Sequence, residues 1–308
     1  MNLPPALTPV LIEIATLGIF FAMLLIYRHT KQRFNHRRLP FQGDALRAPG
    51  EALRVKYEDL KVDFGMYMAM VIVMPLLVYA NYIQAKVIEA SVSAMPSVIL
   101  MLTAVAFFIW RSVQQLRRIT RLRIGYAGEV AVGEQLNQLM LQGYRVFHDV
   151  PGDKAFNVDH VVVGPAGVFA VETKTRTKKE SRDGKADYKV TFDGKKLSFD
   201  CDKGRYNTKF LEQTRRNAEW LSALLTKSTA EKIPVKGVLV LPGWFVNRTG
   251  RADVLVMNHR EVRTLPKAGT TEPLRPDQVQ RIVYQLEQRC RNVELTPKVM
   301  QKEKEAFS

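Results

Sequence analysis

The chain of 308 residues contains very little cysteine. Its two cysteines, Cys201 and Cys290, lie far apart in the sequence. This spacing excludes a disulfide framework and the paired-cysteine pattern of a zinc site, and it fits a reducing compartment. A glycine-rich phosphate-binding loop is also missing.

Charge is almost absent from three long stretches in the first third of the chain. Val10–Tyr27 contains Glu13 as its only charged residue, and Phe64–Tyr82 and Ala90–Trp110 contain none. A helix needs about 20 apolar residues to cross the hydrocarbon core of a bilayer. We therefore expect three transmembrane helices. A cleaved signal peptide is disfavoured, because no basic segment precedes the first stretch.

Basic residues cluster after the first and the third of these stretches, which predicts how the chain is oriented. The first cluster is Arg28, Lys31, Arg33, Arg37 and Arg38, and the second is Arg111, Arg117, Arg118, Arg121 and Arg123. In the connection between the second and third stretches, around Gln84–Glu89, Lys86 is the only Lys or Arg residue. Because Lys and Arg favour the cytoplasmic side, the N-terminus is expected outside and everything after Trp110 in the cytoplasm. A bacterial-type inner membrane fits this arrangement.

The expected organisation is α/β, with three transmembrane helices followed by a mixed-sheet domain flanked by helices. The segments are 1–27 (outside N-terminus and first helix), 28–63 (basic cytoplasmic loop), 64–110 (second and third helices with a short outside loop), 111–124 (basic linker helix), 125–295 (α/β domain) and 296–308 (charged tail). The net charge of +16 favours an anionic partner, either nucleic acid or phospholipid headgroups.

The central stretch of the α/β domain is Asn157–Lys174, with the sequence NVDHVVVGPAGVFAVETK. Two β-branched runs flank a Gly-Pro-Ala-Gly turn, which predicts a β-hairpin. If Val163 pairs with Val168, Asp159 lies opposite Glu172, and both face the same side as Lys174. Two facing carboxylates repel each other, so the pair makes sense with a cation between them.

A Glu-x-Lys triplet occurs by chance in many proteins, where its residues are simply solvated. The full pattern is more specific, because an Asp begins one hydrophobic strand and Glu-x-Lys ends the next across a tight turn. Like charges paired at strand ends break the usual local rule, and such breaks mark functional sites. The arrangement predicts a metal-dependent nuclease site. His160 points to the opposite face, where packing is its expected role.

Three motifs carry a family resemblance: G-E-x-x-V-x-x-x-L from Gly128, N-x-D-H-V-V-V-G-P-x-G-V-F-x-V-E-T-K from Asn157, and Q-T-R-R-N-A-E-W-L from Gln213. Together they resemble the nuclease-related domain called NERD, placed in the PD-(D/E)xK, restriction-endonuclease-like superfamily. The similarity covers roughly Gly125–Leu225. It implies a nuclease site that includes Glu129. Glu134 is a rival for this position, but the Gly-Glu dipeptide and the apolar stripe behind it align better at Glu129. The implied catalytic residues are Glu129, Asp159, Glu172, Lys174 and Gln213.

Mg²⁺ is the expected cofactor, with Mn²⁺ as an alternative, because hard cations prefer oxygen ligands. Its expected ligands are Asp159, Glu172, the backbone carbonyl of Thr173, and Glu129. The residues expected to bind nucleic acid are Arg176, Lys178, Lys179, Lys195, Lys196, Arg215 and Arg216. Asp193-Gly194 predicts the turn of a second hairpin. The cations near this hairpin and near the end of the first one contact phosphates in one interpretation and are equally well explained as the solubilising face of an exposed hairpin.

The function predicted from the sequence is a membrane-anchored metal-dependent nuclease (a phosphodiester hydrolase), with DNA as the expected substrate and the lipid bilayer as a second partner. The alternative is a catalytically silent scaffold that binds nucleic acid and keeps the nuclease fold. Intact acidic positions argue against it, because a pure binder would gain affinity by losing Asp159 and Glu172. A sensor or transporter is disfavoured, since the apolar stretches contain no paired charges. A second copy of the chain or another protein partner is left open.

Overall fold

The computed structural model describes residues 46–87, 95–153, 156–178, 188–202, 204–269 and 273–291, together with Ala22 and Ile26. Its helices are α2 (Glu51–Val87), α3 (Met95–Asn137), α4 (Lys209–Thr229) and α5 (Pro276–Cys290), with 3₁₀ helices η2 (Gln138–Gln142), η3 (Asp200–Asp202) and η4 (Glu261–Ala268). Its strands are β1 (Arg145–Pro151), β2 (Asn157–Gly164), β3 (Gly167–Thr173), β4 (Lys189–Phe192), β5 (Leu197–Phe199), β6 (Tyr206–Asn207), β7 (Val235–Val240), β8 (Phe245–Arg248) and β9 (Leu255–Met257).

The chain divides into two compact units, and two of the boundaries between them fall inside α2 and α3. The second unit consists of Gln42–Val55 and Leu122–Val293. In the first unit, Tyr67 of α2 lies near Arg111 of α3, whose guanidinium donates to the Tyr67 hydroxyl at 3.3 Å. The start of α2 as far as Val55 and the end of α3 from Leu122 belong to the second unit, so both long helices contribute residues to both units.

Among the described helices, α2 alone is long and apolar enough to cross a membrane, since Glu51–Gln84 contains a stretch of 18 residues with a mean hydropathy of 1.8. The expectation of three such helices is therefore corrected to one within the described residues. The stretch Val10–Tyr27 lies outside them, apart from Ala22 and Ile26. The described apolar part of α3 runs only from Met95 to Trp110 before Arg111. That is shorter than the roughly 20 residues that a transmembrane helix needs.

The helices also begin and end elsewhere than the sequence suggested. The segment Glu51–Asp63 was expected at the end of a loop, but it is the first part of α2. It is rich in Glu, Ala, Leu, Lys and Arg, which have high helix propensity. The segment 111–124, expected as a separate linker helix, lies in the middle of α3.

The second unit is built on a five-stranded mixed sheet in the order β1-β2-β3-β7-β9. Neighbours β1, β2 and β3 are antiparallel, whereas β3, β7 and β9 run parallel. A four-stranded sheet in the order β6-β5-β4-β8 lies in the same unit. The fold is thus mixed α/β, as the sequence predicts.

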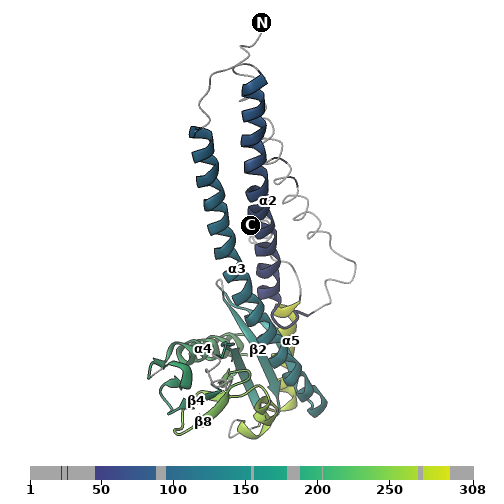
Figure 1. Ribbon diagram of the computed structural model, residues 1–308. Coiled ribbons are helices and arrows are strands. Elements are labelled where there is room, and N and C mark those ends of the chain that lie inside the picture. Colours follow the sequence, from purple (N-terminus) through teal and green to yellow (C-terminus); the bar gives the residue numbers. More distant parts are fainter. Residues whose placement is uncertain are drawn as a thin grey trace. The chain divides into compact units, whose positions relative to one another are not determined.

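Helices cover both faces of the five-stranded sheet, and Figure 1 shows α4 and α5 beside its strands. Ala218, Leu221 and Leu225 of α4 pack against one face together with Ile282 and Leu286 of α5. The opposite face is covered by Val132 and Leu136 of α3, by Leu139 of η2, and by Val262 and Leu265 of η4. These α3 and α4 residues follow the spacing of an amphipathic helix, which is why the sequence predicts their inward faces.

Both predicted hairpins are present. In the first, Val163 pairs with Val168 and His160 with Val171, which confirms the expected register. In the second, β4 and β5 pair around Gly194, whose φ of 95° favours glycine. The Asp193 carboxylate accepts hydrogen bonds from the backbone N–H groups of Lys195 and Lys196, each at 2.9 Å, and these bonds close the turn.

A short segment before and within the first turn of α2 belongs to the second unit. Arg47 donates to the buried carboxylate of Asp149 from Nε at 3.0 Å, and Ala52 N donates to the same oxygen at 3.0 Å. Asn157 donates to the other oxygen at 2.7 Å. Asp149 therefore ties the segment to β1 and β2, although the two are distant in the sequence.

Candidate active site

The site lies where β2 and β3 separate. Their pairing ends at His160 and Val171, whereas β3 continues beside β7 as far as Thr173 and Val240. Beyond the last pair, the backbone N–H of Thr173 donates to the Asp159 carboxylate at 2.7 Å. A side chain of β2 thus replaces the backbone partner that β3 loses, and the Asp159 carboxylate is held at the end of the sheet.

Glu172 is buried and held by three donors, one from the residue that follows β3 and two from α4. Its Oε1 contacts Lys174 Nζ at 2.5 Å and accepts from Gln213 Nε2 at 2.7 Å, and its Oε2 accepts from Asn217 Nδ2 at 2.6 Å. Its side chain faces α4. Val168 and Ala170, which lie on the same face of β3, pack in the core cluster that contains the inward residues of α4. Burial raises the pKa of Glu172, and the Lys174 ammonium opposes this rise.

Asp159 lies next to these groups, on the face of β2 shared by Val161 and Val163. Desolvation first, and then repulsion from Glu172 and Glu129, raises the pKa of Asp159 well above its usual range. The hydrogen bond from Thr173 acts in the opposite direction. Asp159 and Glu172 therefore interact as like charges, as the register predicted.

Glu129 approaches the other two carboxylates from α3. Burial, followed by repulsion from Asp149 and Glu172, raises the pKa of Glu129 to about 7. Its rival Glu134 lies on the same helix but is exposed, so the structure places Glu129 at the site. A catalytic role for Glu129 stays a prediction.

Gly128 allows α3 to come this close. A Cβ atom on Gly128 would lie 1.8 Å from Thr175 Oγ1, 3.0 Å from its Cβ and 3.2 Å from its Cγ2. Rotating Thr175 about χ1 would move Oγ1 but would leave the Thr175 Cβ at 3.0 Å, so a close contact remains. The glycine next to Glu129 is therefore a packing requirement of the site.

Gly128→Ala is expected to reduce cleavage and to destabilise the domain by about 1–3 kcal/mol, because α3 and Glu129 must move away from Thr175. The measurement is the free energy of unfolding together with the cleavage rate. The matched control is Gly65→Ala, a helical glycine with nothing within 4 Å of the added Cβ. It should be neutral or stabilising. Equal behaviour of the two variants would contradict the packing argument.

By their chemistry these residues fit a divalent cation. Repulsion from Glu172 raises the pKa of both Glu129 and Asp159, so a positive charge among them would relieve an unfavourable interaction. As arranged, however, the described part of the chain contains no group of three or more His, Cys, Asp or Glu side chains that could hold a metal ion. Oxygens of Glu172 are turned towards Lys174, Gln213 and Asn217. The ligand set, including the Thr173 carbonyl, stays a prediction.

The basic residues expected to bind nucleic acid have different surroundings. Arg176 pairs with Asp202 and lies over the Phe199 ring, and Arg215 pairs with Asp253 at 2.7 Å. Both thus have structural partners. Arg216 is exposed and lowers the pKa of Glu172 from nearby. Lys178 and Lys195 are exposed, Lys196 lies over the Tyr206 ring, and Lys179 is outside the described residues.

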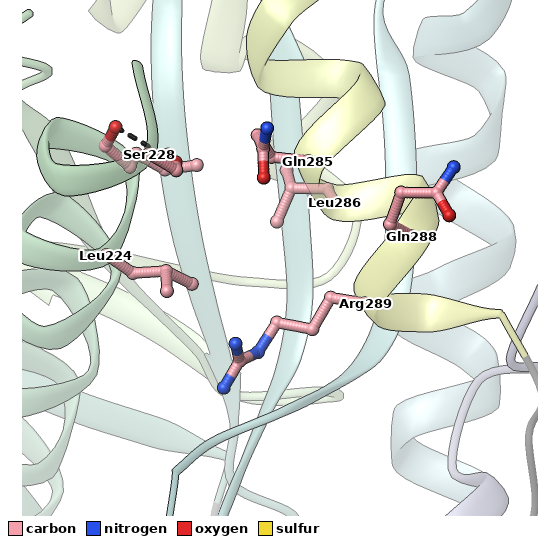
Figure 2. A pocket seen from close by; sticks show the side chains of 7 residues that line it. Leu224, Ser228, Gln285, Leu286, Gln288 and Arg289 are labelled. Atoms are coloured by element: carbon pink, nitrogen blue, oxygen red, sulfur yellow. Dashed lines mark hydrogen bonds between the residues drawn. The ribbon is translucent and has the colours of Figure 1, made fainter. Parts of the chain in front are cut away.

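A separate cavity of about 250 Å³ lies between α4 and α5. Figure 2 shows Leu224 and Ser228 on one side and Gln285, Leu286, Gln288 and Arg289 on the other. Arg289 Nε donates a hydrogen bond to the Pro151 carbonyl oxygen at 2.6 Å. None of the predicted catalytic residues lines this cavity, so it is not part of the candidate site.

The structure adds two residues that the sequence did not assign to the site. Asn217 binds Glu172, and its spacing from Gln213 on one helix side was the available signal. Asp149 raises the pKa of Glu129, but nothing in the local sequence distinguishes it from a solvated strand residue. His160, as expected, lies on the other face, where its Nδ1 is 2.8 Å from His148 Nδ1.

Comparison with protein families identifies a nuclease-related domain (NERD) at residues 124–242. The match includes α3 from Ile124, the separating strands β2 and β3, and Gln213 and Asn217 of α4. Comparisons with curated proteins and with solved structures gave no significant match. The family match indicates a nuclease-like function for the second unit.

Proposed function

We propose that this chain is a membrane-anchored, metal-dependent nuclease that hydrolyses phosphodiester bonds, with DNA as its substrate. One observation carries the proposal. Within the nuclease-related domain, the buried Glu172 holds Lys174 at 2.5 Å while Asp159 lies across the opened end of the β2–β3 pair. Buried, mutually repelling carboxylates beside an ammonium group are costly to fold and are characteristic of a catalytic site.

Each residue has a role that follows from its surroundings. Asp159 and Glu172, with Glu129 and the Thr173 carbonyl, would hold Mg²⁺ or Mn²⁺. The chemistry that such a cation supplies, when bound, is activation of water and neutralisation of phosphate charge. Lys174 carries a positive charge to the same point, where it orients the attacking water or stabilises developing negative charge. Gln213 and Asn217 orient Glu172 through its two oxygens.

Membrane attachment is supported by α2, whose segment Glu51–Gln84 has the length and composition of a membrane span. The basic residues of α3, from Arg111 to Arg123, support a cytoplasmic position for the nuclease-related domain. We therefore propose a bacterial-type inner-membrane protein with its catalytic unit in the cytoplasm.

The test uses the full chain in detergent micelles, because Arg47 and Ala52 contact Asp149 and a fragment beginning at Arg121 would lack part of the domain. The protein is incubated with plasmid, linear duplex DNA, single-stranded DNA and RNA. Each substrate is tested with Mg²⁺, Mn²⁺ and chelator. Metal-dependent cleavage that is lost in Lys174→Ala is the expected result, and it selects the substrate at the same time.

Binding without cleavage under every condition would instead support the catalytically silent scaffold. The specific observation favouring that alternative is that Glu172 already has donors on both of its oxygens. Metal binding discriminates between the two functions, because a scaffold has no need of a cation among Asp159, Glu172 and Glu129. Calorimetric titration of Mn²⁺ into the wild type and into Asp159→Asn measures this directly.

A further inference from the structure

A second cavity in the same unit contains a different set of residue types. Its volume is about 560 Å³, within the range of ~300–1,000 Å³ that is common for ligand sites. Its lining includes Lys178 from the segment after β3, Tyr188 just before β4, Phe245 and Val246 of β8, and His259 and Arg260 between β9 and η4. None of the predicted catalytic residues is among them.

Two large aromatic side chains of this cavity are open to solvent. Tyr188 is 59% exposed and Phe245 is 58% exposed. They are held together through the backbone, because Phe245 N donates to Tyr188 O at 2.6 Å where β8 begins beside β4. The next residue of β8, Val246, is buried in the core of the small sheet. The fold thus anchors the strand through Val246 while leaving the two rings uncovered.

Cationic and hydrogen-bonding groups surround the rings. Lys178 and Arg260 are exposed. His259 accepts at Nδ1 from Gly243 N at 3.3 Å, so its neutral ring carries the proton on Nε2 and is a donor there. The cavity's carboxylate, Glu261, is paired with Arg248 at 2.5 Å. The charge presented to a ligand is therefore positive.

The backbone that follows β3, the strand that contains Glu172, leads from the candidate active site to this cavity. Lys174 N donates to Val240 O at 2.9 Å, and Trp244 Nε1 donates to Arg176 O at 3.3 Å. The segment leaving Lys174 therefore runs beside the segment leaving β7. It ends with the Lys178 side chain at Gly243, where an added Cβ would lie 3.9 Å from Lys178 Nζ.

We propose that this cavity binds single-stranded nucleic acid, with unpaired bases on Tyr188 and Phe245 and the phosphate backbone at Lys178 and Arg260. Exposed aromatic rings next to cations recognise a single strand, because every unpaired base offers a face for stacking, whereas the bases of a duplex are already stacked and paired. The proposal rests on the proposed nuclease function and narrows its substrate. Of these four residues, the sequence pointed only to Lys178.

The experiment measures the fluorescence anisotropy of labelled oligodeoxythymidine, oligouridine and a duplex of equal length, with the full chain in micelles and chelator present to prevent cleavage. The variants are Tyr188→Leu and Phe245→Leu, which keep an apolar side chain and remove the ring. The matched control is Tyr284→Leu, which removes a ring of α5 that is also 58% exposed. Arg260→Gln is a second test that leaves both rings in place.

Single-strand affinity is expected to fall about 10-fold in each ring variant, with little change for the duplex. Arg260→Gln should weaken binding and reduce its salt dependence, because one phosphate contact is lost. The Tyr284 variant should bind as the wild type does. A preference for oligodeoxythymidine or oligouridine identifies which kind of strand occupies the cavity.

Unchanged single-strand affinity in both ring variants, or a wild type that binds no single strand, would overturn the proposal. Because binding is measured without metal, this failure is distinct from failure of the nuclease. Cleavage by the wild type with normal binding by the ring variants would leave the nuclease without this subsite. Weakened binding in those variants without any cleavage by the wild type would leave the subsite without a nuclease.

Discussion

Asp159→Asn is expected to abolish metal-dependent cleavage and, at the same time, to raise the melting temperature of the metal-free protein. Asparagine has nearly the same shape and keeps an oxygen that can accept the hydrogen bond from Thr173 N. It removes the charge that repels Glu172 and Glu129, and this repulsion is part of what raises the pKa of Asp159. Without that charge, the expected loss of cleavage rate is at least ~10³-fold.

The expected gain in stability is about 2–4 °C in melting temperature for each ~1 kcal/mol of repulsion removed. Lys174→Ala is the matched comparison, because it should abolish cleavage while lowering the melting temperature. Glu172 is buried and would lose its ammonium partner at 2.5 Å, and an unpaired buried carboxylate is destabilising.

The two variants should therefore agree in activity and differ in stability. The measurements are thermal unfolding in chelator and cleavage with Mg²⁺. Full cleavage by either variant would remove that residue from the catalytic site. A lower melting temperature in Asp159→Asn would instead indicate that the Asp159 carboxylate stabilises the β2–β3 pair by more than its repulsion from Glu172 and Glu129 destabilises the fold.

The metal-free protein is expected to lose stability as the pH rises through about 7, and Glu129 is expected to contribute strongly to this loss. Its pKa is raised from 4.5 to about 7 on folding, first by burial and then by Asp149 and Glu172. The folded state therefore binds the proton more tightly than the unfolded state does. The corresponding stabilisation is fully present below about 4.5 and is lost as the pH rises through about 7.

The size of this effect follows from the shift in pKa, since one unit corresponds to ~1.4 kcal/mol, so the contribution of Glu129 is of the order of 3 kcal/mol. Glu129→Gln should flatten the dependence of the melting temperature on pH and stabilise the metal-free protein at pH values above 7. Thermal unfolding in chelator, across pH 5 to 9, is the measurement.

Glu134→Gln is the control for this experiment. Glu134 is exposed on the same helix, so its replacement should leave the pH profile unchanged. Adding Mg²⁺ should restore stability at high pH in the wild type, since a bound cation favours the ionised carboxylates. Identical pH profiles for Glu129→Gln and the wild type would show that protonation of Glu129 does not contribute to the stability of the metal-free protein.

The pattern of residues was sufficient to predict the local architecture of the site. β-branched runs on both sides of Gly164–Gly167 specify a hairpin, and a period of two then determines that Asp159 and Glu172 share a face. The apolar spacing in α4 likewise predicts that Ala218, Leu221 and Leu225 face inward. These features depend on neighbours in the sequence or on a single turn, so their physical cause is present in the local segment.

Contacts between distant segments could not be obtained in the same way. Asn217 and Gln213 lie on a helix whose inward face is predictable, but their bonds to Glu172 depend on how α4 crosses β3. Arg176 and Arg215 have the composition of phosphate-binding residues, yet Asp202 and Asp253 pair with them. Charge in a sequence shows that a group needs a partner, and only the fold shows which partner it has.

The sequence by itself determined the mixed α/β class, the hairpin register and the carboxylates that face one another, because side-chain periodicity and turn chemistry act within short segments. The family resemblance already favoured Glu129 over Glu134, but only the tertiary structure brings Glu129 beside those carboxylates. That position depends on the close approach of α3 at Gly128. The tertiary structure also brought Tyr188 and Phe245 together with Lys178 and Arg260, because the packing that joins these chain segments acts across long separations in the sequence.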